Sequence, residues 1–121
     1  MKKQLTYALP LVAALCLTAC SSGPKSMYYW KDYPPTVYER LKNDDSSISE
    51  QITKMEKYFT EASRKQLAVA PGAHAHLGLL LTDVGQYESA RRQFESEKQL
   101  FPESTVFMDF LLKNKSQGGK K

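Results

Sequence analysis

The sequence has few of the residues that build catalytic or metal sites. Its 121 residues include two cysteines, two histidines and one tryptophan. The histidines, His74 and His76, are two positions apart, so on a helix they point about 200° away from each other and cannot share one metal ion. The chain has no Gly-rich phosphate loop and no serine in a nucleophile-elbow setting. The sequence therefore predicts a non-catalytic protein without a metal or cofactor.

The chain also lacks an apolar run long enough to cross a membrane. The stretch from Leu5 to Ala19 has 15 residues and is interrupted by Thr6 and Pro10. A spanning helix needs about 20 apolar residues. Two lysines precede the stretch and small residues end it, which is the layout of a secretory signal. Two alternatives remain, an ordinary cleaved signal peptide and a lipid-attachment site.

The four residues that end this stretch, Leu17-Thr18-Ala19-Cys20, resemble the bacterial lipobox. The resemblance implies that Cys20 receives a diacylglyceryl group, that the signal peptide of residues 1–19 is removed, and that the new amine is acylated with a fatty acid such as palmitate. Two or three acyl chains anchor a protein firmly to a membrane. Residue 21 is a serine and not the aspartate that resembles an inner-membrane retention signal. We therefore expect the periplasmic face of the outer membrane.

No disulfide can form within the predicted mature chain, because Cys16 leaves with the signal and Cys20 carries lipid. Removing residues 1–19 from the 121 leaves 102, which suits one small domain. The whole chain has 17 basic and 13 acidic residues, but residues 20–112 have 11 basic and 13 acidic ones. The basic excess lies in the signal and the tail, so nucleic acid is not an expected partner.

We expect a lipidated tether over residues 20–26, a helical domain over 27–113 and a disordered, Lys-rich tail over 114–121. Within the domain, Ser47 and Glu50 have the spacing of a capping box. Behind it apolar residues recur at steps of three and four, which predicts a helix as far as about residue 66; they are Ile48, Ile52, Met55, Phe59 and Ala62. No segment carries a strand signal of weight, so the predicted fold class is all-α.

Residues 71–104, PGAHAHLGLLLTDVGQYESARRQFESEKQLFPES, resemble one tetratricopeptide repeat, which is a helical hairpin. The residues that match the repeat in one register are Leu77, Gly78, Gly85, Tyr87, Ala90, Phe94 and Pro102. Gly78 and Ala90 would let the two helices approach closely. Two positions differ: His74 stands where the repeat has a large aromatic residue, and Glu97 stands where it has alanine. A carboxylate at that place needs hydrogen-bond donors or must stay at the surface.

One hairpin cannot bury its own faces. We expect the helix over residues 48–66 to cover one side of it and a last helix over 104–113 to cover the other. A further short helix is expected to begin at Pro35 and end near Lys42. The last helix would place four apolar residues on one face: Val106, Phe107, Phe110 and Leu111.

Several stretches occur in a characteristic order: YYW, VYERL, PGAHAHLG, GQYESARRQFESEKQLFPES and FMDFLL. In this order they resemble a family of small Gram-negative lipoproteins of unknown function. Members of that family resemble tetratricopeptide proteins and are often encoded beside a curli-secretion-type (CsgG-like) lipoprotein. The resemblance implies a place in an envelope assembly, with a CsgG-like outer-membrane lipoprotein as the protein partner.

Three functions follow from these observations. The favoured hypothesis is a lipid-anchored adaptor that holds an outer-membrane lipoprotein assembly together without catalysis. The alternative is a regulator of an envelope enzyme such as a peptidoglycan synthase. An enzyme or ligand binder in its own right is least compatible with the residue inventory.

The aromatic segment beside the tether is the predicted docking surface, because Tyr and Trp are enriched in binding hot spots. Repeat hairpins usually bind in the groove of their first helices, here lined by His74, Leu77 and Leu81, but flanking helices are expected to fill part of it. Packing over the hairpin is the favoured role of Trp30 and Tyr38. The residues expected to contact a partner are Tyr28, Tyr29 and Tyr33, with His74 and Arg91 at the margin.

Overall fold

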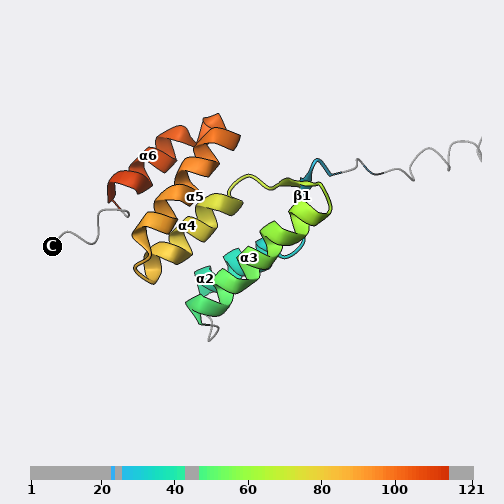
Figure 1. The fold of residues 1–121 in the computed structure, drawn as a ribbon, viewed down its shortest axis with the longest axis horizontal. Helices are drawn as coiled ribbons and strands as arrows, with labels where there is room; N and C mark the ends of the chain where they lie inside the picture. Colours follow the sequence, from blue (N-terminus) through green and yellow to red (C-terminus); the bar gives the residue numbers. More distant parts are fainter. Residues whose placement is uncertain (1–22, 24–25, 43–46, 115–121) are drawn as a thin grey trace, which may run out of the picture.

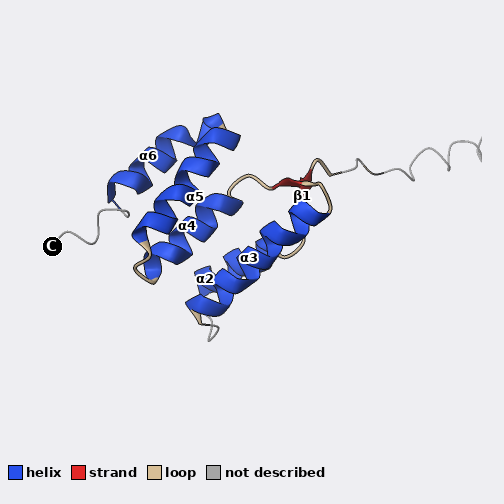
Figure 2. Cartoon of the chain, viewed as in Figure 1, coloured by secondary structure: helices blue, strands red, loops and turns tan. Residues whose placement is uncertain are grey.

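The computed structural model describes residues 23, 26–42 and 47–114. The predicted signal peptide, the lipidation site Cys20, most of the tether and all but one residue of the predicted tail lie outside the described residues. The described part consists almost entirely of helices (Figure 2), which confirms the all-α class. Its elements are β1 (Tyr28–Tyr29), α2 (Tyr33–Lys42), α3 (Ile48–Arg64), β2 (Ala68–Val69), α4 (Ala73–Asp83), α5 (Tyr87–Leu100), the short 3-10 helix η1 (Pro102–Ser104) and α6 (Thr105–Asn114).

The α4–α5 hairpin lies at the centre of a stack of helices (Figure 1). Helix α3 packs on α4, α6 packs on α5, and α2 packs on the far end of the stack against α3. The flanking helices therefore lie on the two sides of the hairpin, in the arrangement that the sequence predicts. In the part of the chain that the structure describes, no helix is both long and apolar enough to span a bilayer.

The start of α3 carries half of the predicted capping box. The Ser47 hydroxyl accepts a hydrogen bond from the backbone N–H of Glu50, with 3.2 Å between nitrogen and oxygen. Along the predicted apolar stripe, Met55 and Ala62 are fully buried. The helix ends at Arg64, two residues before the predicted end, and the backbone then turns through Gln66 with a φ of 54°.

The hairpin closes through a contact between Gly78 of α4 and the ring of Phe94 on α5. A Cβ atom added to Gly78 would lie 2.4 Å from Phe94 Cε1, well inside van der Waals contact. The Phe94 side chain and Ala90 are both fully buried. At the turn between the helices Gly85 has a φ of 78°, a backbone conformation that residues other than glycine rarely adopt. Small residues thus set how closely α4 and α5 approach.

Glu97 joins the far end of α5 to the beginning of α4. Its side chain is 2% exposed. The carboxylate accepts hydrogen bonds from the backbone N–H groups of Gly72, at 2.6 Å, and Ala75, at 3.4 Å. Gly72 stands at the N-cap position and has no side chain to cap the helix. A residue of the neighbouring helix therefore satisfies the free N–H groups at the start of α4.

Two short strands, β1 and β2, lie beside the Tyr58 side chain, and the sequence does not predict them. Strands β1 and β2 pair in parallel, with Tyr28 opposite Ala68 and Tyr29 opposite Val69. The buried Tyr58 hydroxyl donates a hydrogen bond to the Tyr29 carbonyl and accepts one from the Ala70 N–H. Burial raises the pKa of Tyr58, so the hydroxyl keeps its proton. Two residues are too few for a strand pattern, which is why the sequence carried no signal.

Helix α6 buries a different face from the one that the sequence predicts. Leu111 is buried as expected, and Met108 lies beside it, 1% exposed. The other three residues of the predicted face are exposed: Val106, Phe107 and Phe110. Apolar residues occur nearly all round this helix, so their spacing could not decide which face packs on α5.

We predict that Gly78→Ala destabilises the fold, although alanine ordinarily favours a helix over glycine by about 1 kcal/mol. The reason is the buried Phe94 ring, which leaves no room for a methyl group. Gly78→Leu should cost about 1–3 kcal/mol through overpacking. Urea unfolding followed by circular dichroism measures both. Combining Gly78→Ala with Phe94→Leu should recover part of the loss, and an unchanged melting temperature for Gly78→Leu would contradict the contact.

Glu97→Ala should lower the free energy of unfolding by about 1–3 kcal/mol, because two buried N–H groups lose their acceptor. Glu97→Gln keeps one acceptor oxygen and should cost less. A matched control is Glu95→Ala on the same helix, because the ion pair of Glu95 with Lys98 is long, at 3.8 Å, and such pairs contribute little. Equal losses for the two alanine variants in urea unfolding would show that Glu97 does not cap α4.

Candidate functional site

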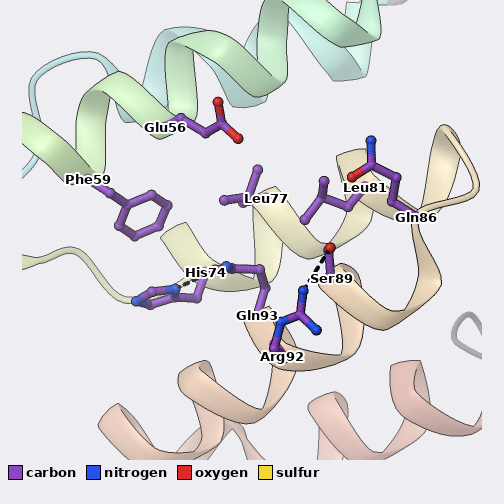
Figure 3. A pocket seen from close by; sticks show the side chains of 9 residues that line it. All are labelled: Glu56, Phe59, His74, Leu77, Leu81, Gln86, Ser89, Arg92 and Gln93. Atoms are coloured by element: carbon purple, nitrogen blue, oxygen red, sulfur yellow. Dashed lines mark hydrogen bonds between the residues drawn. The ribbon is translucent and has the colours of Figure 1, made fainter.

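A groove of about 440 Å³ runs between α3 and the α4–α5 hairpin. Figure 3 shows that side chains from all three helices point into it. Its lining residues are Glu56, Phe59, His74, Leu77, Leu81, Gln86, Ser89, Arg92 and Gln93. The groove is therefore a property of the stacked helices and not of one element.

The floor of the groove is apolar. Leu77 and Leu81 lie one turn apart on α4, and only 5% and 6% of their surfaces are exposed. The half-buried Phe59 of α3 adds its ring from the other side. A chain that lies in this groove would bury apolar side chains against these three residues.

The rim carries opposite charges on its two sides. Glu56 projects from α3, whereas Arg92 projects from α5 (Figure 3). The Arg92 guanidinium donates a hydrogen bond to the Ser89 hydroxyl, 3.1 Å away. Both rim residues are exposed. They can pair with charged groups of a bound chain without losing all their water.

His74 lies at one end of the groove, in contact with α3 and α5. Its ring stacks on Phe59, with centroids 4.4 Å apart and planes at 29°. Its Nδ1 lies 2.7 Å from Oε1 of Gln93. An amide oxygen only accepts, so Nδ1 is the donor in this hydrogen bond. His74 thus joins α3, α4 and α5 at one end of the groove.

His76 lies on the opposite side of α4 and takes no part in the groove. It is 6% exposed, and desolvation lowers its pKa from 6.5 to about 4. The charge of Arg40, which pairs with Asp83 at 3.0 Å, acts in the same direction. The two histidines therefore cannot act together, as their spacing predicts. Among the described residues, no three His, Cys, Asp or Glu side chains are grouped to hold a metal ion.

The aromatic segment is arranged differently from the predicted docking surface. The Tyr29 side chain is buried, 6% exposed, and its ring stacks on Tyr58 at 5.3 Å. Its side chain belongs to the core. Tyr28 and Tyr33 are half-buried. Trp30 stacks on Tyr33, with centroids 6.2 Å apart, and is 44% exposed, whereas Tyr38 is 59% exposed.

Arg92 lines the groove, whereas Arg91, expected at the margin of the partner surface, does not. Arg91 is exposed on α5 outside the lining. The sequence did not single out the polar lining residues of α5 and its N-cap, which are Gln86, Ser89, Arg92 and Gln93. Their spacing of three and four was a usable signal, because it places them on one side of a helix beside the predicted groove.

Residues 27–111 match the model of a family described as Domain of unknown function (DUF4810). The match covers more than half of the chain. The chain belongs to the DUF4810 family. Comparison with curated proteins and with solved structures found no match. Membership of DUF4810 agrees with the resemblance to a family of unknown function and assigns no activity to the chain.

The buried His76 predicts loss of stability in mild acid. Its pKa is about 4 in the folded chain and 6.5 ordinarily. Between these values the unfolded chain binds a proton that the folded chain does not, so stability is complete above pH 6.5 and falls as the pH drops towards 4. From pH 7 to pH 5 the expected loss from this group is about 2 kcal/mol.

Urea unfolding at the two pH values measures this loss. His76→Leu removes the titrating group, so its stability should change less between pH 7 and pH 5 than that of the wild type. Leu79→Ala, a change at a partly buried residue of the same helix that has no titratable group, is the control and should keep the wild-type dependence on pH. The same pH dependence in wild type and His76→Leu would contradict the assignment.

Proposed function

We propose that this protein is a non-catalytic, lipid-anchored adaptor that binds a segment of a partner protein in the groove between α3 and the α4–α5 hairpin. The observation that carries the proposal is the groove itself, with an apolar floor and a rim of opposite charges. Grooves of this kind take a peptide by burying apolar side chains and pairing polar groups at the edge.

The arrangement of the groove residues supports binding more than catalysis. Among the lining residues of the described chain, Ser89 alone has a hydroxyl group. This hydroxyl accepts a hydrogen bond from the guanidinium group of Arg92 instead of donating one to a base. The Nδ1 of His74 is held by Gln93. A nucleophile needs a base within hydrogen-bond reach, and this pair does not supply one.

The place of the adaptor follows from the lipobox, which implies an anchor at Cys20 in the outer membrane with the domain on the periplasmic side. The segment from Cys20 to Ser26 is short, so the domain would stay close to the bilayer. The resemblance to tetratricopeptide proteins supports a protein ligand. A CsgG-like lipoprotein in the same membrane is the partner that the family resemblance implies. Regulation of an envelope enzyme such as a peptidoglycan synthase is the alternative.

A photo-crosslinking amino acid at position 93 tests the groove in the full-length protein in its membrane. We predict a crosslinked partner for this position and none for position 88, which is exposed on α5 outside the groove. Mass spectrometry of the crosslinked band identifies the partner. An outer-membrane lipoprotein supports the adaptor, whereas a synthase supports the alternative.

Charge reversals at the rim then test the specificity of binding. Arg92→Glu and Glu56→Lys should each reduce the crosslinked fraction about tenfold, because each places a like charge against the partner. The control is Lys57→Glu, an exposed neighbour of Glu56 outside the lining. Full crosslinking in both rim variants, or equal crosslinking from positions 93 and 88, would rule out the groove as the binding site.

A further inference from the structure

The outer face of α6 is apolar and has no partner among the described residues. Val106 is 84% exposed, Phe107 is 56% exposed and Phe110 is 57% exposed. The two phenylalanine rings stack on each other, with centroids 6.5 Å apart. Exposed large apolar side chains scattered singly are common, but three adjacent ones on a single helix mark a contact surface.

This outer face is a feature of a correctly packed helix. The inner face is filled by Met108 and Leu111, which are 1% and 3% exposed. An ion pair of 2.6 Å between Lys98 of α5 and Asp109 of α6 favours the packing of this inner face on α5. Helix α6 is the last element of the stack (Figure 1). The terminal helix of a helical stack ordinarily has a polar outer face, which keeps the protein soluble.

Opposite charges stand at the two ends of the apolar face. Glu103 lies in η1, immediately before α6, and Lys113 lies in the last turn of α6. The sequence runs Glu103, Val106, Phe110 and Lys113 at steps of three, four and three, so these residues follow one side of the helix. Both charged residues are exposed, and neither forms an ion pair within the described part of the chain.

We propose that two copies of the chain pair through this face, with their α6 helices antiparallel. Val106 and Phe110 each lie two residues from Met108, and Glu103 and Lys113 each lie five residues from it. A twofold axis at the level of Met108 therefore sets Val106 of one copy on Phe110 of the other. The same axis sets Glu103 of each copy opposite Lys113 of the other. Such self-complementarity is what a symmetric dimer interface requires.

A second copy fits this surface better than the other candidates. The residues that follow Asn114 are KSQGGKK, which contain no large apolar side chain that could cover the face. A lipid surface would favour basic residues throughout, whereas this face has one acidic and one basic end. The charges on this face are thus complementary to those of a second copy whose α6 runs antiparallel.

The pairing would leave the proposed groove open, because the groove lies on the α3 side of the hairpin and α6 lies on the other side. One helix on each side makes a small interface, and small interfaces give weak association. Confinement of two anchored copies to one membrane raises their effective concentration and favours pairing. The dimer would present two grooves.

Co-purification of two differently tagged full-length copies, co-expressed, chemically crosslinked in the membrane and then extracted in detergent, tests the pairing while the copies are confined to one bilayer. Wild-type copies should recover each other. Glu103→Lys in both copies, or Lys113→Glu in both copies, places like charges at two sites of the interface and should reduce recovery about tenfold. One copy with Glu103→Lys and one with Lys113→Glu again have opposite charges at both sites, so this mixed pair should be recovered as well as the wild type.

Matched controls are Lys57→Glu and Glu88→Lys, which reverse exposed charges elsewhere on the stack and should leave recovery unchanged. Circular dichroism checks that every variant keeps its helical content. No recovery between wild-type copies, wild-type recovery in both single variants, or no gain in the mixed pair would each overturn the proposal. A face that contacts lipid would instead show stronger membrane association for Glu103→Lys and no rescue in the mixed pair, which also overturns it.

Discussion

The two hydrogen bonds that Glu97 accepts at the start of α4 hold the centre of the structure together. They join the end of α5 to the turn at Gly72, which cannot cap a helix by itself. A buried carboxylate is costly unless donors surround it. Here the donors are N–H groups that the helix start leaves free, so each side satisfies the other. The helix that supplies the groove floor therefore begins in register only when the hairpin is closed.

The rotation of α4 then decides which side chains enter the groove. With Gly78 against Phe94, one side of the helix lies on α5, and His74, Leu77 and Leu81 face the space beside α3. His76 is turned to the opposite side, where Tyr33 of α2 lies against its ring, with the two centroids 6.0 Å apart. His74 and His76, which are two positions apart in the sequence, thus have different structural roles. One links three helices at the groove, and the other is a neutral core residue.

The sequence predicts those parts of the fold that local rules determine. The Ser47 cap of α3, the turn glycine Gly85 and the close approach of α4 and α5 at Gly78 and Ala90 each depend on residue type at fixed spacing. The buried face of α6 and the pairing of β1 with β2 could not be read in this way. The first depends on which of several apolar faces meets α5, and the second depends on the Tyr58 hydroxyl reaching Tyr29 from a distant helix. Side-chain contacts between elements, and not local secondary-structure propensities, determine the buried face of α6 and the pairing of β1 with β2.

The two ends of the stack are finished in different ways, and this difference separates their roles. At the α2–α3 end, aromatic rings and a short pair of strands cover the core: Tyr29 is buried, and the Tyr58 hydroxyl bonds to the backbone of Tyr29 in β1 and of Ala70, the residue after β2. At the α6 end an apolar face stays open. A twofold interface uses the same face of both copies, so the proposed self-association through α6 stops at two copies. The groove lies between these ends, lined by side chains of α3, α4 and α5, and binding there is compatible with pairing through α6.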